Sequence, residues 1–224
     1  MKTASHTGWG LLFAAAAGLA ASYLASSYLP VAFPYSGIWK ASGIVLLGVF
    51  AVLRGRTLIG AGLLTCSIGD FMLEFTPPEW TLGMAAFGVG HLIYTASFLK
   101  SASRSPVTPL GWGCAAATLM ISAAMALWFL PDMGELQVPG LAYQAVITGM
   151  TATAFVTGAP LRVRIGAAIF MLSDSLIALD LYKGIQPPGG SVWVTYALAQ
   201  CLLAWTPLNV RSNSEVSAPL PKQS

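Results

Sequence analysis

The feature that most constrains this chain is a succession of apolar segments, each about as long as a membrane-spanning helix, with the charged residues gathered in the connections. Charged residues make up 8% of the chain, whereas soluble domains usually contain about 25%. A transmembrane helix needs about 17 to 25 predominantly apolar residues. Segments near this length are 8–28, 36–53, 57–75, 80–99, 108–130, 140–158, 163–182 and 191–208. We therefore expect an all-α, polytopic membrane bundle of eight transmembrane helices.

The connections alternate in charge from one side of the predicted membrane to the other. Nine of the eleven Lys and Arg residues lie on one side, beginning with Lys2 and including Arg54 and Arg56. The opposite side carries acidic residues and one base, Lys183. Because cytoplasmic loops carry the excess of Lys and Arg in membrane proteins, this pattern predicts that both termini are cytoplasmic.

The segments follow one another so closely that we expect one membrane domain, residues 1–210, and a disordered cytoplasmic tail rich in Ser and Pro at 211–224. Segment 8–28 has some features of a signal peptide, but its apolar run is longer than the 7 to 15 residues of a typical signal core, so we expect it to be retained. The expected location is a cell membrane, the inner membrane if the source is bacterial. The sequence predicts no cofactor, metal or nucleic-acid partner and leaves the oligomeric state open.

Two aspartates, Asp70 and Asp174, lie inside apolar segments. A carboxylate at membrane depth costs roughly 2.5 to 3.5 kcal/mol on insertion scales, so it is normally retained where it faces a partner, a cavity or a reaction. Counting 1.5 Å per helical residue, we place the intramembrane polar residues in the outer half or at the centre of the membrane. These residues are Lys40, Asp70, His91, Tyr143, Asp174, Tyr196 and Gln200. Helical spacing gives each of their segments a polar stripe, which predicts one outward-opening pocket that contains water.

Structural roles are open for several of these residues. Lys40 is near enough to the boundary to extend its amine to the interface, or it can form an ion pair with Asp70. His91 can be an interior histidine whose ring forms a hydrogen bond with a neighbouring helix. Tyr143 and Tyr196 can belong to the aromatic belt at the membrane surface.

Four strings, in this order and spacing, resemble the YhhN family of lysoplasmalogenase-like membrane proteins. They are Gly69-Asp70-Phe71-Met72-Leu73, Gly90-His91-Leu92-Ile93-Tyr94 with Phe98, the stretch 166–176 that ends in Ser173-Asp174-Ser175-Leu176, and Thr195-Tyr196-Ala197-Leu198-Ala199-Gln200. The resemblance implies an eight-span hydrolase that cleaves the vinyl ether bond of lysoplasmalogens, releasing a fatty aldehyde and glycerophospho-ethanolamine or glycerophospho-choline. The functional positions it implies are Lys40, Asp70, His91, Tyr94, Ser173, Asp174, Tyr196 and Gln200. Family members commonly have Pro after the lysine, where this chain has Ala41.

The residues suit that chemistry, because vinyl ether hydrolysis begins with protonation of a carbon and passes through an oxocarbenium ion. Two carboxyl groups in unequal surroundings can act as acid and as charge stabiliser, as in glycosidases. We expect the deeper Asp174 to be the acid and Asp70 to stay ionised, with His91 as a further catalytic group. We expect Lys40 to hold the phosphate, and Tyr94, Tyr143, Ser173, Tyr196 and Gln200 to bind the rest of the substrate.

Two other functions would use similar residues. A proton-coupled transporter of a small or lipid-like solute would need polar groups that continue into the cytoplasmic half, where this chain has almost none. A metal-dependent lipid hydrolase would need about three converging ligands, and His91 is the one histidine inside a predicted span.

Overall fold

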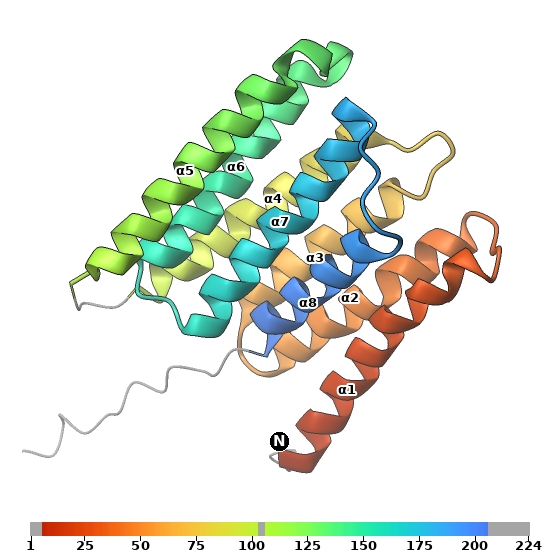
Figure 1. The fold of residues 1–224 in the computed structure, drawn as a ribbon. Helices are drawn as coiled ribbons and strands as arrows, with labels where there is room; N and C mark the ends of the chain where they lie inside the picture. The colour runs from red at the N-terminus through yellow and green to blue at the C-terminus, as the bar shows by residue number, and fades with distance from the viewer. Residues whose placement is uncertain (1–5, 103–105, 206–224) are drawn as a thin grey trace, which may run out of the picture.

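All regular structure in residues 6–102 and 106–205, the ranges that the computed structural model describes, is helical, which confirms the all-α class. The α-helices are α1 (His6–Ser22), α2 (Tyr35–Leu53), α3 (Thr57–Met72), α4 (Trp80–Lys100), α5 (Pro109–Phe129), α6 (Gln137–Val156), α7 (Leu161–Lys183) and α8 (Ser191–Ala204). Short 3-10 helices follow α1 and connect α5 to α6. Consecutive α-helices run in opposite directions (Figure 1).

The chain is a multi-pass membrane protein. Five helical stretches are long and apolar enough to cross a membrane: Gly8–Ser27, Tyr35–Leu53, Trp80–Lys100, Pro109–Asp132 and Leu161–Lys183. The shorter apolar helices are α3 with 16 residues and α8 with 14 residues. The total of eight spans, the single domain and the cytoplasmic termini therefore stay predictions. The predicted tail 211–224 lies outside the described residues.

Four helix boundaries differ from the sequence prediction by three or more residues. Helix α1 ends at Ser22 instead of 28, although a 3-10 helix follows it to Ser27, and helix α8 ends at Ala204 instead of 208. Helix α3 ends at Met72 instead of 75. Helix α6 begins at Gln137 instead of 140, so that Pro139 is in its first turn. Proline is tolerated there because the first backbone N–H groups of a helix have no acceptor within the helix.

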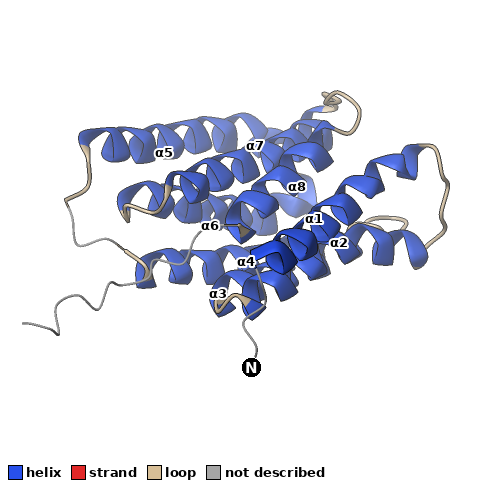
Figure 2. Ribbon diagram, turned by 90° about the horizontal axis from the view of Figure 1, so that it is seen from below, coloured by secondary structure: helices blue, strands red, loops and turns tan. Residues whose placement is uncertain are grey.

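Helix α8 closes the bundle by packing against α7 on one side and against α1, α2 and α3 on the other. Figure 2 shows it between these groups when the molecule is turned. Helices α5 and α6 pack together at the far side of α7 and α4 (Figure 1). We name the end with connections 23–34, 73–79, 130–136 and 184–190 the outer end and the opposite end the inner end, following the predicted orientation.

Glycines allow the closest helix contacts, as expected in lipid, where small residues at interfaces permit close packing. Gly43 of α2 lies directly against the backbone of Ala20 in α1, and a Cβ at this position would overlap it. Gly62 of α3 lies against the ring of Tyr94 in α4 in the same way. The second contact bears on function, because it sets the position of a buried tyrosine described below.

Candidate functional site

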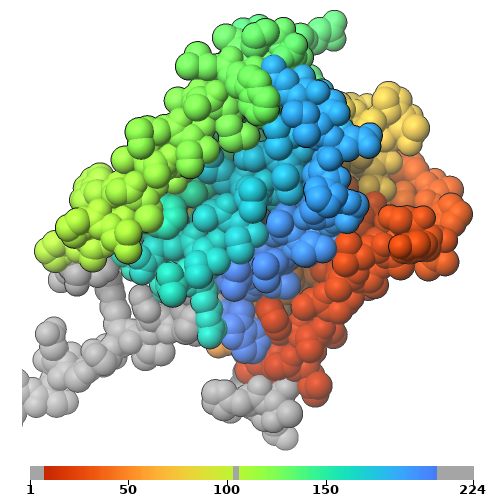
Figure 3. All heavy atoms as spheres, in the orientation of Figure 1, coloured from red at the N-terminus to blue at the C-terminus, as the bar shows by residue number. Residues whose placement is uncertain are grey.

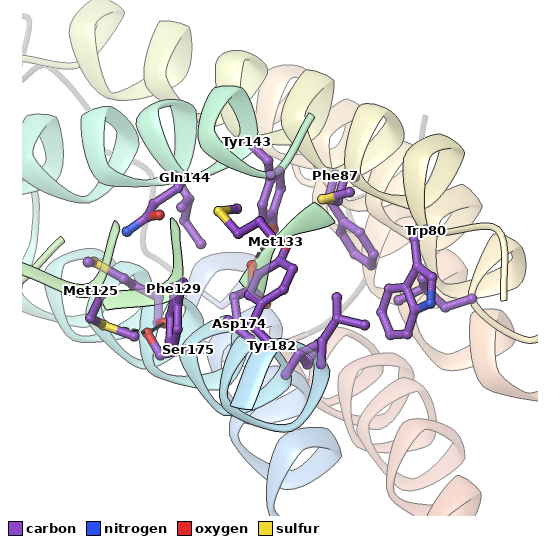
Figure 4. A pocket seen from close by; sticks show the side chains of 18 residues that line it. Trp80, Phe87, Met125, Phe129, Met133, Tyr143, Gln144, Asp174, Ser175 and Tyr182 are labelled. Carbon is purple, nitrogen blue, oxygen red and sulfur yellow. Dashed lines mark hydrogen bonds between the residues drawn. The ribbon is translucent and has the colours of Figure 1, made fainter. Parts of the chain in front are cut away.

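A cavity of about 100 Å³ lies in the outer half of the bundle between α4, α5, α6 and α7. Its lining is mainly apolar and includes Phe87, Met125, Phe129 and Met171, with Trp80 near one end (Figure 4). Flexible methionine side chains and aromatic rings form an adaptable apolar surface. The cavity therefore suits an apolar group more than a polar solute.

Of the site residues predicted from the sequence, Asp174 of α7 and Tyr143 of α6 line this cavity. The Tyr143 hydroxyl donates a hydrogen bond to Oδ2 of Asp174, and the two side chains point toward one another in Figure 4. His91 of α4 lies behind them, with Nε2 at 3.0 Å from the Tyr143 hydroxyl oxygen and 3.9 Å from Oδ2 of Asp174. We refer to His91, Tyr143 and Asp174 as the Asp174 group.

The hydrogen-bond directions in the Asp174 group follow from the proton count. The Tyr143 hydroxyl has one proton and donates it to Asp174, so its oxygen must accept a hydrogen bond from Nε2 of His91. This inference places the imidazole proton on Nε2 and leaves Nδ1 without one when the ring is neutral. Nδ1 is buried and has no hydrogen-bond partner among the described residues. The Asp174 group is thus a directed chain from His91 through Tyr143 to the cavity carboxyl.

A second buried network surrounds Asp70 and is formed by Asp70 of α3, Tyr94 of α4, and Tyr196 and Gln200 of α8. Tyr196 donates to Oδ2 of Asp70 at 2.6 Å, and Gln200 donates to the Tyr196 oxygen at 3.1 Å. Tyr94 donates to Oε1 of Gln200 at 2.8 Å. We refer to these four residues as the Asp70 group. Their polar atoms are largely satisfied by one another, as buried polar groups require.

An aromatic ring separates the two groups. The Phe170 ring centroid lies 4.6 Å from that of His91 and 5.2 Å from that of Tyr196. Phe87, which also lines the cavity, packs edge-on against Tyr196 at 5.9 Å. The Asp70 group is therefore near the cavity but behind its wall.

A third polar cluster lies near the outer end, where Lys40 and Tyr23 both donate to Oε1 of Glu74, at 3.0 and 2.6 Å. The ammonium of Lys40 also lies 5.6 Å from the Tyr23 ring centroid and 6.0 Å from that of Trp193. Such positions over aromatic rings favour a cation. The carboxylate that Lys40 contacts is thus Glu74 and not Asp70.

This cavity does not bring the nine predicted site residues together, because its lining includes two of them, Asp174 and Tyr143. The seven outside the lining are Lys40, Asp70, His91, Tyr94, Ser173, Tyr196 and Gln200. Burial also differs from the depth estimate. Asp70 is 2% exposed, whereas the Asp174 side chain, farther from the helix end, is 15% exposed because it borders the cavity.

Ser173 illustrates how a neighbour of a cavity residue can be structural. Its side chain is fully buried, and its hydroxyl donates to the Val192 carbonyl at the start of α8. Three further polar residues that were not predicted from the sequence also line the cavity: Gln144, Ser175 and Tyr182. Extending the Asp174 face along its helix by i+1, i+4 and i+8 positions would have found Ser175 and Tyr182.

No three His, Cys, Asp or Glu side chains converge as a metal site within the described ranges. The three cysteines, Cys66, Cys114 and Cys201, are free thiols.

Comparison with known proteins gives two matches. The model of the YhhN family matches residues 35–206, most of the helical bundle. Lysoplasmalogenase TMEM86B of Rattus norvegicus is 32% identical to this chain over 180 residues, which cover 77% of this chain and 73% of the relative. No solved structure matches.

Proposed function

Because this chain belongs to the YhhN family, we propose that it is a membrane hydrolase that cleaves the vinyl ether bond of lysoplasmalogens. The products would be a fatty aldehyde and glycerophospho-ethanolamine or glycerophospho-choline. The observation that carries the proposal is the apolar cavity with the hydrogen-bonded Asp174 and Tyr143 on its wall. Support also comes from the similarity to a protein named lysoplasmalogenase.

The first step is protonation of the alkene carbon farther from the ether oxygen. Protonated Asp174 gives its proton to this carbon, and the electron pair of the double bond forms the new C–H bond. The other alkene carbon and the oxygen then share the positive charge as an oxocarbenium ion. General acid catalysis of this kind contributes about 10²- to 10⁴-fold to the rate. Asp174 is suited to it because its carboxyl borders the cavity.

Water completes the reaction by adding to the oxocarbenium carbon. The water loses a proton to the ionised Asp174, and the resulting hemiacetal collapses to the aldehyde and the alcohol of the glycerol backbone. The overall reaction consumes one water and needs no cofactor. In this scheme Tyr143 and His91 orient the Asp174 carboxyl and stabilise its ionised form between the two proton transfers, because charge-assisted hydrogen bonds are the stronger ones.

Asp70 acts as the second carboxyl of the mechanism without touching the substrate. A negative charge behind Phe87, which lines the cavity, and the neighbouring Phe170 attracts the oxocarbenium ion, since charges interact strongly in a low-dielectric interior. Asp70 also holds Tyr196 in place. We assign Tyr94, Tyr196 and Gln200 to positioning this carboxylate, and Lys40 to the outer surface near the headgroup.

The decisive experiment is aldehyde release by the purified protein from a lysoplasmalogen, with the saturated ether and the ester analogues as comparisons. We expect aldehyde from the vinyl ether, no product from the saturated ether and, in D₂O, one deuterium on the aldehyde carbon next to the carbonyl. Asp174→Asn should lower turnover by about 10² or more. Asp180→Asn is the matched control, because Asp180 lies on the same helix but is exposed and outside the cavity lining.

Three results would contradict the proposal. Fatty acid release from the ester would indicate an ordinary lysophospholipase. Loss of activity with a chelator would indicate a metal-dependent hydrolase. Absence of aldehyde together with proton-coupled solute uptake in vesicles would indicate the transporter function, with the same Asp and His residues as a proton relay.

A further inference from the structure

A second cavity lies at the inner end of the bundle, between α5 and α7 with α6 behind it. Its volume is about 350 Å³, and its lining includes Leu110, Cys114, Phe155, Arg164 and Leu172. This volume is within the range of about 300 to 1,000 Å³ that is usual for ligand sites. The two helices form neighbouring ridges on one face of the molecule (Figure 3). We refer to this cavity as the α5–α7 groove.

Arg164 is the charged residue in the groove lining. Its Nε atom is buried and has no hydrogen-bond partner among residues 6–102 and 106–205. The ion pairs of these residues do not include Arg164. Arg164 is half-buried, and a charged group that leaves water without gaining a partner is costly. The guanidinium therefore has the properties of a site for an anionic ligand.

Arg56, at the same end of the bundle, is a half-buried arginine whose guanidinium does have hydrogen-bond partners. Its guanidinium donates to the carbonyl oxygens of Leu203 and Ala204, at 2.8 and 3.3 Å. Burial, followed by the nearby charge of Arg54, lowers the pKa of Arg56 to about 10, so it stays charged at neutral pH. Arg56 is thus used to hold the end of α8, whereas Arg164 faces a groove.

The groove is accessible from lipid. Leu110, Leu161 and Leu172 on its rim are 73%, 64% and 51% exposed. Arg164 is three residues after the start of α7, about 4.5 Å inside the inner end at 1.5 Å per residue. The lining then continues along one face of α7 to Leu172, a further distance of about 12 Å. A phosphate at Arg164 would thus be at the level of lipid headgroups, with an apolar channel leading into the membrane.

We propose that the α5–α7 groove binds one anionic phospholipid, with its phosphate on Arg164 and an acyl chain along α7 toward Leu172. Arginine recognises phosphate through paired N–H donors. An anionic headgroup is favoured over a zwitterionic one because the groove lining has no carboxylate to receive an ammonium group. The connections at this end, 54–56, 101–108 and 157–160, contain no acidic residue, and the first two also contain arginine. Basic pockets of this kind between transmembrane helices bind anionic lipids.

This site is separate from the cavity of the Asp174 group and does not depend on the proposed hydrolysis. The test is native mass spectrometry of the delipidated full chain in detergent with dioleoyl phosphatidylglycerol or dioleoyl phosphatidylcholine. We expect one bound phosphatidylglycerol, held about tenfold more tightly than phosphatidylcholine, because the groove offers the choline ammonium the positive Arg164 and no carboxylate. Arg164→Gln should abolish this preference. Arg162→Gln is the matched control, since Arg162 is exposed and outside the groove lining.

Equal binding of the two lipids by the wild-type chain, or equal losses in both arginine variants, would overturn the proposal, because general surface charge would then explain the binding. A second variant keeps the arginine and fills the groove. Ala168 lies in the groove lining and is exposed, so Ala168→Phe should exclude the acyl chain. If Arg164→Gln fails to fold, this variant decides: lost phosphatidylglycerol binding supports the site, and retained binding refutes it.

Discussion

The hydroxyl of Tyr143 hydrogen-bonds both His91 and Asp174, so removing it tests the proposed mechanism most directly. In Tyr143→Phe the ring stays in the cavity wall, but Nε2 of His91 is left 3.9 Å from Oδ2 of Asp174. That distance is too long for a direct hydrogen bond. The variant thus loses a charge-assisted hydrogen bond, which is usually worth about 1.5 to 3 kcal/mol. If the bond is made fully in the transition state, the rate falls by about 10- to 150-fold.

The assay is steady-state aldehyde release from a lysoplasmalogen in detergent micelles. We expect kcat to fall and KM to change little, because the ring still contributes to the cavity wall. Tyr182→Phe is the matched control, since Tyr182 also lines the cavity but its hydroxyl is not bonded to the Asp174 group. The mechanism is refuted if Tyr143→Phe retains wild-type turnover, or if both variants lose the same activity.

Three further predictions concern the residues around this group. Asp70→Asn should lower aldehyde release less than Asp174→Asn, because Asp70 acts from behind the cavity wall, and equal losses in the same assay would contradict the division of roles. Gly62→Ala should destabilise the protein by about 1 to 3 kcal/mol, measured by thermal unfolding in detergent, because the new Cβ overlaps the Tyr94 ring; an unchanged melting temperature would show that the ring can move. Lys40→Met should destabilise by about 1 to 2 kcal/mol by leaving the half-buried Glu74 carboxylate without its cation, and adding Glu74→Gln should recover part of that loss in a double-mutant cycle.

The local hydropathy pattern of the sequence was sufficient to predict much of the fold. The apolar segments predict where the helices lie, because an apolar run of span length has few alternatives in lipid. Most boundaries agree within two residues, for example at α2 and α4. Among the larger differences, those at the end of α3 and the start of α6 arise where hydropathy continues past a turn or begins after a tolerated proline.

The site was harder to predict. The residues on one face of a helix follow from local sequence spacing, but the helix that packs against that face does not. The polar stripes do contain the residues that form hydrogen bonds, such as Asp70 and Tyr196. However, these two residues are 126 positions apart, and their contact depends on α8 packing against α3. Nothing in the spacing distinguishes that arrangement from one in which Asp70 meets Lys40.

The sequence alone therefore determined the membrane class, the order of the helices and the family resemblance, since these depend on composition, periodicity and motifs. Only the tertiary structure decided that Asp174 borders a cavity while Asp70 is enclosed behind aromatic rings. The physical reason is that the surroundings of a carboxyl depend on which other helices pack around its face. Phe170 and Phe87, apolar residues with no distinctive pattern, form the wall that separates the two aspartates.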